Sequence, residues 1–233
     1  MKNTETTKLP PGQKERQNFP RFGMPHYADF KLPVLDLYTI QLSGDVPAQT
    51  LTQQDWGALE RVELTADFHC VTTWTYRNVQ WSGFRFRDFY TQFVQPQISE
   101  RDELTFVTFT SLDRYRASMF LTDALADTIL LADRMDGQPL SAKHGAPMRL
   151  VAPAHYGYKN VKHLRKIGVW RTEQKDKRGI RKMMEHPRGR VALEERGRYI
   201  PGWLLRLVYR PLINPTIQQF EQTTPQELRN ETI

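Results

Sequence analysis

Cysteine is almost absent from the chain: its 233 residues contain one, Cys70. A single cysteine cannot form an intramolecular disulfide, and it cannot supply a four-cysteine zinc site or iron–sulfur site. The chain also lacks a C-x-x-C-H motif, so no c-type haem can be attached. This use of cysteine is typical of a reducing compartment.

Long apolar runs are absent as well. No stretch approaches the roughly 18 apolar residues that a membrane-spanning helix requires. The first 20 residues contain neither the apolar core of a secretory signal nor a twin-arginine pair. Glycine and proline are present in ordinary amounts, which excludes a collagen-like or low-complexity chain. We therefore expect a soluble, cytoplasmic, globular protein.

Positive charge is unevenly distributed. The net charge is +7, yet residues 1–150 hold 16 basic and 18 acidic side chains, whereas residues 151–233 hold 17 and 8. The densest part, 159–190, has twelve basic and three acidic residues. Such a concentration fits an anionic partner, which would be a phosphorylated cofactor, nucleic acid or an anionic membrane, and it fits a solvated basic surface equally well.

Hydrophobic patterning predicts a mixture of strands and helices. Residues 1–22 are polar and aperiodic, so we expect an extended or disordered lead-in. Alternating apolar residues predict a strand over 62–68 that runs directly into His69 and Cys70. Further strands are expected at 104–112 and 147–153, short helices at 51–59 and 87–94, and either a strand or a helix at 161–170.

Two further helices are predicted. Leu121, Leu125, Ile129 and Ala132 recur at helical spacing, with Thr122 as a candidate N-cap and Gly137 as a stop. Residues 199–213 mix apolar side chains with arginines, which favours an amphipathic helix resting on the protein body or on a membrane surface. Because strands and helices follow no regular βαβ rhythm, we predict an α+β fold with a mixed β-sheet.

Three functional interpretations of Cys70 compete with that of a small buried hydrophobe: a nucleophile, a ligand of a bare metal ion, and a ligand of a metal held by a cofactor. A nucleophile is disfavoured, because the adjacent His69 would point to the opposite face of the strand. A metal ligand is plausible for a soft thiolate, but one cysteine needs a cofactor to supply the other ligands. Such a cofactor needs cations, and the segment 144–167 offers Arg149, a permissive Gly157 and Lys159.

Two segments together resemble a known family, the sulfite oxidase-like molybdopterin-dependent oxidoreductases. The family's cysteine segment is similar to DFHCVTTWTYRNVQWSGF, and its second signature is similar to HGAPMRLVAPAHYGYKNVKHLRKI. The intervening FVTFTSLDRY and LTDALADTILLADRMDGQPL also resemble the family, so that the likeness covers about residues 35–170. The two signatures occur in the family's order, which makes the resemblance specific.

The resemblance implies the sulfite oxidase-like molybdopterin-binding fold and a molybdenum–molybdopterin cofactor whose metal is bound by Cys70, the catalytic centre. It implies a lead-in at 1–22, a cofactor-binding domain at 23–175 and a basic extension at 176–233 that packs on the same domain. His69, Trp74 and His155 are candidates for tuning the metal thiolate. The implied pterin and phosphate contacts are Tyr27, Ser111, His144, Arg149, Gly157, Tyr158 and Lys159.

The implied reaction is two-electron oxygen-atom transfer on a small substrate, with a separate electron-transfer partner. Sulfite oxidases carry arginines soon after the cysteine, whereas the first one here is Arg77, so reduction of a sulfoxide or N-oxide stands as the alternative. The basic C-terminal region could dock on a redox partner or on an anionic membrane. A nucleic-acid-binding protein is the non-enzymatic alternative, which the sparse aromatics disfavour, because Trp170 is alone within 160–190.

Overall fold

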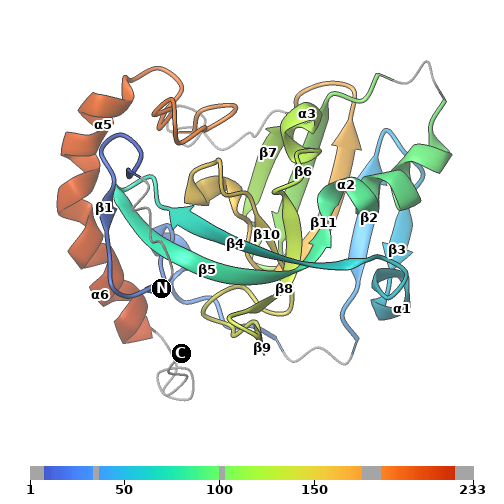
Figure 1. Cartoon of the computed structure of the whole chain (residues 1–233), viewed down its shortest axis with the longest axis horizontal. Coiled ribbons are helices and arrows are strands. Elements are labelled where there is room, and N and C mark those ends of the chain that lie inside the picture. Colours follow the sequence, from blue (N-terminus) through green and yellow to red (C-terminus); the bar gives the residue numbers. More distant parts are fainter. Residues whose placement is uncertain (1–7, 34–36, 100–102, 175–184, 224–233) are drawn as a thin grey trace, which may run out of the picture.

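Two β-sheets organise the computed structural model, which describes residues 8–33, 37–99, 103–174 and 185–223 (Figure 1). The first sheet is built on a long antiparallel hairpin of β4 (Arg61–His69) and β5 (Trp74–Arg85). From β5 it continues through β8 (Leu130–Met135) to β10 (Arg149–Val151). Two short strands complete it: β1 (Lys14–Glu15) runs parallel to the start of β5, and β9 (Gln138–Pro139) pairs with β8.

The second sheet mixes parallel and antiparallel pairs. Its order is β3 (Gln49–Leu51), β2 (Ile40–Gly44), β11 (Leu164–Trp170), β6 (Phe106–Ser111) and β7 (Arg116–Phe120). Strands β2 and β11 are parallel, and the other pairs are antiparallel. The mixed sheets with few helices confirm the predicted α+β fold.

The described helices are short. They are η1 (Pro25–Tyr27), α1 (Gln53–Trp56), α2 (Phe86–Phe89) with its extensions η2 (Tyr90–Val94) and η3 (Gln95–Gln97), α3 (Leu121–Ala124), η4 (Gly157–Lys159), α5 (Gly202–Tyr209), η5 (Arg210–Leu212) and α6 (Ile213–Thr223). Helices α5 and α6 form one edge of the molecule beside β1 (Figure 1). In the described part of the chain, none of the helices has the length and apolar character that a membrane crossing demands.

Apolar side chains gather in two clusters. The larger one joins both sheets and includes Leu42, Phe109, Leu131 and Ile167, all essentially inaccessible to water. The smaller one covers the hairpin end near Cys70 with Phe19, Trp74, Trp81 and their neighbours. Burial of large aromatic side chains stabilises the hairpin end, so Cys70 stands on a rigid part of the fold.

The predicted helix over 121–132 is wrong. Helix α3 covers only Leu121–Ala124, Phe120 rather than Thr122 stands at its N-cap, and Leu130–Met135 is strand β8. Strand β8 lies between β5 and β10, and its first three residues are all buried. A strand buried on both faces has a continuous apolar run, which spacing alone cannot distinguish from a helix. Gly137, with φ +78°, turns the chain from β8 to β9.

Most other element predictions are confirmed. Strand β4 matches 62–68, β6 matches 104–112, β10 lies within 147–153, and α1 and α2 match the short helices. Residues 161–170, left open between strand and helix, contain β11, and 199–213 contains α5. Within the lead-in, residues 8–22 are largely extended and contribute β1 and the buried Phe19.

Gly83 permits the close approach of β5 to β8. A Cβ atom built there would lie 2.6 Å from the Ala132 Cα and would also collide with the Leu131 carbonyl oxygen. We predict that Gly83→Ala lowers the free energy of unfolding by about 2–3 kcal/mol, measured by urea denaturation.

Gly137→Ala is the matched control, because its Cβ meets nothing within 4 Å and only the positive φ opposes it. This variant should lower the free energy of unfolding by only about 1 kcal/mol. Equal losses in the two variants would contradict a close contact at Gly83.

Candidate active site

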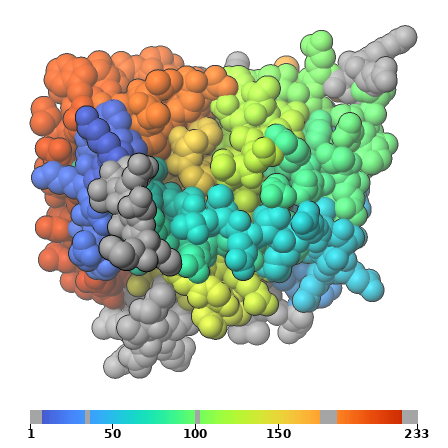
Figure 2. Space-filling view, in the orientation of Figure 1, coloured from blue at the N-terminus to red at the C-terminus, as the bar shows by residue number. Residues whose placement is uncertain are grey.

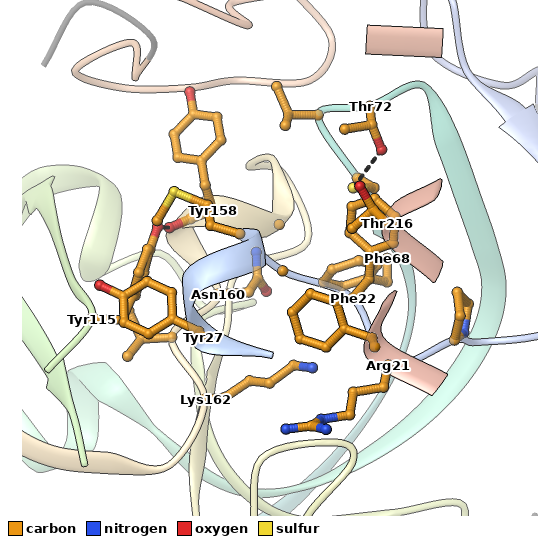
Figure 3. A pocket seen from close by; sticks show the side chains of 18 of the residues that line it. Arg21, Phe22, Tyr27, Phe68, Thr72, Tyr115, Tyr158, Asn160, Lys162 and Thr216 are labelled. Atoms are coloured by element: carbon orange, nitrogen blue, oxygen red, sulfur yellow. Dashed lines mark hydrogen bonds between the residues drawn. The ribbon is translucent and has the colours of Figure 1, made fainter. Parts of the chain in front are cut away.

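A cavity of about 360 Å³ lies against Cys70. Its wall combines the N-terminal segment 19–30, the end of the β4–β5 hairpin, the end of β6, the segment 142–163 and helices α5 to α6. In Figure 3, Lys162 and Arg21 lie together at one end of the cavity, and Thr72 and Thr216 lie at the other. Segments from the whole length of the chain therefore meet at one site.

Cys70 is presented by a tight turn, residues 70–73, which we call the cysteine turn. The backbone N–H of Cys70 donates to the Trp74 carbonyl at 2.8 Å, and Thr73 adopts φ +80°. The Thr72 hydroxyl lies 3.1 Å from Sγ of Cys70, drawn as a dashed line in Figure 3. Burial raises the pKa of the thiol, while the Thr72 hydrogen bond and the charges of Arg196 and Lys162 oppose the rise. The thiol is therefore protonated near neutral pH.

Both ends of the described chain hold the cysteine turn. Gln13 donates from Nε2 to the Cys70 carbonyl at 3.1 Å. Arg196, whose side chain is fully buried, donates to the carbonyls of Val71 and Pro11 and pairs with Glu194 at 3.1 Å. A buried arginine with this many partners fixes the backbone that it binds. Sequence reasoning missed Arg196, because one arginine in a basic region carries no individual signal.

Five of the seven predicted cofactor contacts line the cavity: Tyr27, Ser111, Arg149, Gly157 and Tyr158. Gly157 opens helix η4, where a Cβ would lie 2.6 Å from the ring of Phe68. The close approach expected at this glycine is therefore to an aromatic ring of the protein itself.

Lys159 and His144 are not in the cavity wall. The Nζ of Lys159 donates to the carbonyls of Ser118 and Pro187 at 2.6 and 2.7 Å, and burial lowers its pKa to about 8. The His144 ring packs on Phe19 with centroids 4.8 Å apart, and burial together with nearby cations lowers its pKa to about 2, so this ring is neutral.

Arg149 is a fully buried cation at the wall. Its Nη1 donates to the His144 carbonyl at 2.8 Å, and its guanidinium lies over the ring of Trp81 at 4.9 Å. Within the described residues Nη2 has no hydrogen-bond partner, and burial lowers the pKa of Arg149 to about 9. A buried guanidinium with an open donor is a site for an anionic ligand.

Lys162 stands next to Arg149 and was not singled out from the sequence. It lines the cavity, and its Nζ donates to the Lys143 carbonyl at 3.0 Å. Burial lowers the pKa of Lys162 to about 7, and the positive charges of Arg149, Arg21 and Lys143 add to the effect, while the Asp113 carboxylate opposes it. Like charges gathered in one wall destabilise the fold until an anion neutralises them. This end of the cavity fits a phosphorylated cofactor.

Metal binding requires more than the protein offers. In the portion of the chain with described positions, no three His, Cys, Asp or Glu side chains form a group that could hold a metal ion. Cys70 supplies one thiolate, and a cofactor with its own metal ligands would complete the coordination. The donor set and the cationic wall therefore fit a metal carried by a large anionic cofactor.

The three candidates for tuning the metal thiolate are separated in space. Trp74 lines the cavity, but His69 and His155 do not. The Nδ1 of His69 lies 2.8 Å from the Thr75 hydroxyl, and Nε2 of His155 lies 3.9 Å from an Asp123 carboxylate oxygen.

Residues 29–177 match the family model of the oxidoreductase molybdopterin-binding domain. The chain belongs to this family. The predicted sulfite oxidase-like family is confirmed, and the protein is a molybdenum-dependent oxidoreductase with molybdenum–molybdopterin as its cofactor. Gln13 and Arg196, which hold the cysteine turn, lie outside the matched range.

Three curated relatives show how far the similarity extends. The uncharacterized oxidoreductase YuiH of Bacillus subtilis is 31% identical, over 70% of this chain and 79% of that protein. Mitochondrial sulfite oxidase of Drosophila melanogaster is also 31% identical, over 57% of this chain and 27% of that protein. The protein-methionine-sulfoxide reductase catalytic subunit MsrP of Campylobacter jejuni is 29% identical, over 59% of this chain and 50% of that protein. The match thus spans a quarter to a half of the latter two proteins.

A solved structure has the same fold. The sulfane dehydrogenase SoxCD of Paracoccus pantotrophus aligns with a TM-score of 0.54 and 20% identity, over 66% of this chain and 43% of that one. The likeness confirms the sulfite oxidase-like fold class predicted from the sequence.

Lys162 provides a test of the cationic wall. Its pKa in the folded chain is about 7 against an ordinary 10.5, so its burial opposes folding increasingly as pH falls from 10.5 to 7 and fully below that. We predict that Lys162→Met raises the thermal midpoint of the cofactor-free protein at pH 7 by about 3 °C or more, a gain that disappears towards pH 10.5.

The same variant, purified from a cofactor-producing host, should contain much less molybdopterin than the wild type. Lys166→Met is the control, because Lys166 lies on β11 outside this cavity. A Lys162→Met protein that is no more stable than the wild type and contains as much molybdopterin would contradict the assignment of this wall to an anion.

Proposed function

We propose that Sγ of Cys70 binds the molybdenum of the cofactor, and that the wall around Arg149 and Lys162 binds its phosphorylated pterin. The observation that carries the proposal is the position of the single thiol in a cavity whose other end is cationic. When bound, the cofactor supplies two-electron oxygen-atom transfer chemistry.

The chain's own residues would hold and orient this group. The Thr72 hydroxyl is within hydrogen-bond distance of the thiolate and would tune its electron donation. Arg149 and Ser111 would donate to the anionic pterin, with Tyr27 and Tyr158 beside it. Lys159 would position η4 through its two carbonyl contacts, and His144 would position Arg149 through its own carbonyl.

Replacing the thiol tests this arrangement. We expect near-stoichiometric molybdenum and pterin in wild-type protein from a cofactor-producing host. In Cys70→Ser, the molybdenum should be lost or the thiolate-to-metal absorption band altered, because an alcohol is a poor soft ligand. Metal analysis, pterin fluorescence and absorption spectroscopy measure these quantities.

Thr65→Ser is the control, since Thr65 is exposed on the same strand, β4, and does not line the cavity. It should keep metal, pterin and spectrum. Full molybdenum-dependent turnover by Cys70→Ser would refute the proposed ligand.

The substrate would be a small neutral oxide, an S-oxide or N-oxide, rather than sulfite. Arg77, the first arginine after the cysteine, does not line the cavity and lies 3.6 Å from carboxylate oxygens of both Asp67 and Glu15. Near the cysteine turn the wall includes Phe22, Phe68 and Trp74, which belong to one apolar cluster with Cys70. Reduction of a sulfoxide consumes two electrons and two protons and releases a thioether and water.

Oxidation of a small oxyanion is the second candidate, favoured by Arg21 and Lys162 in the same cavity. The two directions differ in the redox state that the substrate meets. We expect dimethyl sulfoxide or trimethylamine N-oxide to restore the absorption band of the reduced, molybdenum-loaded enzyme. Sulfite should leave the oxidised enzyme unchanged. Bleaching of the oxidised band by sulfite, without reoxidation by either oxide, would reverse this assignment.

Electrons would pass through a separate partner. The single cysteine cannot hold an iron–sulfur cluster, and the sequence lacks the motif that attaches a c-type haem. The Campylobacter relative is named a catalytic subunit, which accords with a separate partner. A cytoplasmic location stays a prediction from the sequence.

A further inference from the structure

Helix α5 has two apolar faces. Leu205 and Tyr209 are buried against the body, as expected for a surface helix. On the other side Trp203, Leu204, Leu207 and Val208 are 40 to 61% exposed. We call these four residues the outer face. Their i, i+1, i+4, i+5 spacing places them in one continuous stripe, and a contiguous exposed apolar stripe marks an interaction site.

Exposed aromatic and apolar residues continue beyond the outer face. Tyr199 and Ile200, just before α5, are exposed, and so is Leu212 in η5. Trp203 and Tyr199 combine an apolar ring with a polar edge, which is the combination that favours the boundary between lipid and water. Helices α5 and α6 lie along one edge of the molecule (Figures 1 and 2), and the exposed fractions of the outer face show that the described residues leave it accessible to solvent.

The charge beside the outer face is positive. Arg206 and Arg210 lie on α5 and η5, and the sequence 202–212 contains no acidic residue. The nearest acidic side chains in sequence are Glu194, which pairs with both Arg196 and Arg206, and Glu195, which pairs with Arg190. Three arginines thus share two carboxylates, and the exposed Arg210 adds a further positive charge. An apolar stripe bordered by net positive charge complements a surface with an apolar interior and anionic groups.

A second copy of the chain is a poorer occupant. A two-fold interface on this face would bring the net positive charge of the two copies together, because Arg206 is already paired with Glu194 and no acidic side chain of α5 or η5 can pair with Arg210 of the other copy. Anionic lipid headgroups supply the missing negative charge. We propose that the outer face of α5 binds peripherally to an anionic lipid membrane, with the helix lying in the plane of the headgroups.

This surface adjoins the candidate active site. Tyr209, Leu212 and Thr216 line the cavity, and Leu212 is also 49% exposed. Binding through the outer face would therefore bring the cavity rim close to the lipid surface. A membrane-bound electron carrier or an apolar substrate would then reach the cavity at that surface.

Vesicle sedimentation of the cofactor-loaded full chain tests the proposal. The probes are vesicles of phosphatidylcholine alone and of phosphatidylcholine with 30% phosphatidylserine. We expect wild-type protein to bind the anionic vesicles at least about 10-fold more tightly than the neutral ones, and binding to weaken as salt is raised. The double variant Trp203→Ser, Leu207→Ser should reduce anionic binding by about 10-fold or more.

Leu37→Ser is the matched control, because Leu37 is 62% exposed just before β2, in the second sheet rather than on α5. It should bind vesicles like the wild type. Both proteins should keep wild-type molybdenum content and circular dichroism, since the changed side chains face solvent. Trp203→Phe should also remove most of any blue shift in tryptophan fluorescence on vesicle addition.

Four results would overturn the proposal. They are no binding to either vesicle, equal binding to neutral and anionic vesicles, binding that the double variant leaves unchanged, and a concentration-dependent dimer in ultracentrifugation that the double variant abolishes while lipid binding is absent. The last result would assign the outer face to a second copy of the chain.

Discussion

The attachment of the cysteine turn to both ends of the chain is the contact on which the site depends. Gln13 binds the Cys70 carbonyl, and Arg196 binds the next carbonyl, that of Val71, together with Pro11. The turn is thereby fixed from outside the β4–β5 hairpin that carries it. A side chain on a backbone held this way has little freedom to reorient, which is what the proposed metal ligand would require. The N-terminal and C-terminal segments are thus part of the site.

The charges at the cationic end of the cavity oppose folding, whereas the contacts of the cysteine turn support it. Arg149 and Lys162 have lowered pKa values because burial and mutual repulsion disfavour their charged forms. Both effects would diminish if a phosphorylated ligand entered, so binding of the cofactor at this wall would stabilise the fold. The residues whose charges oppose folding of the cofactor-free protein are therefore the ones that would recognise the cofactor.

Much of this site was predictable from sequence. Cys70 is the only cysteine, and it follows a clean alternating strand, so its place at a strand end was expected and is found. The two signatures also identified Arg149 and Tyr158, which line the cavity. The sequence could not distinguish Lys159 from Lys162, because both lie in one basic segment. Lys159 differs in its contacts with β7 and the segment 185–190, and Lys162 differs in its nearness to Arg149. The helix predicted over 121–132 failed because burial of β8 by both neighbouring layers removes the two-residue period. The role of Arg196 depends on a contact over 125 positions of sequence, which no local pattern encodes.

The central claim is that molybdenum is bound by the Cys70 thiolate. X-ray absorption at the molybdenum edge counts the sulfur atoms around the metal, and it can be measured on cofactor-loaded wild-type and Cys70→Ser proteins side by side. If Cys70 binds the metal, any molybdenum that the Cys70→Ser protein retains should have one sulfur neighbour fewer than in the wild type. An unchanged sulfur count in a metal-loaded variant would contradict it.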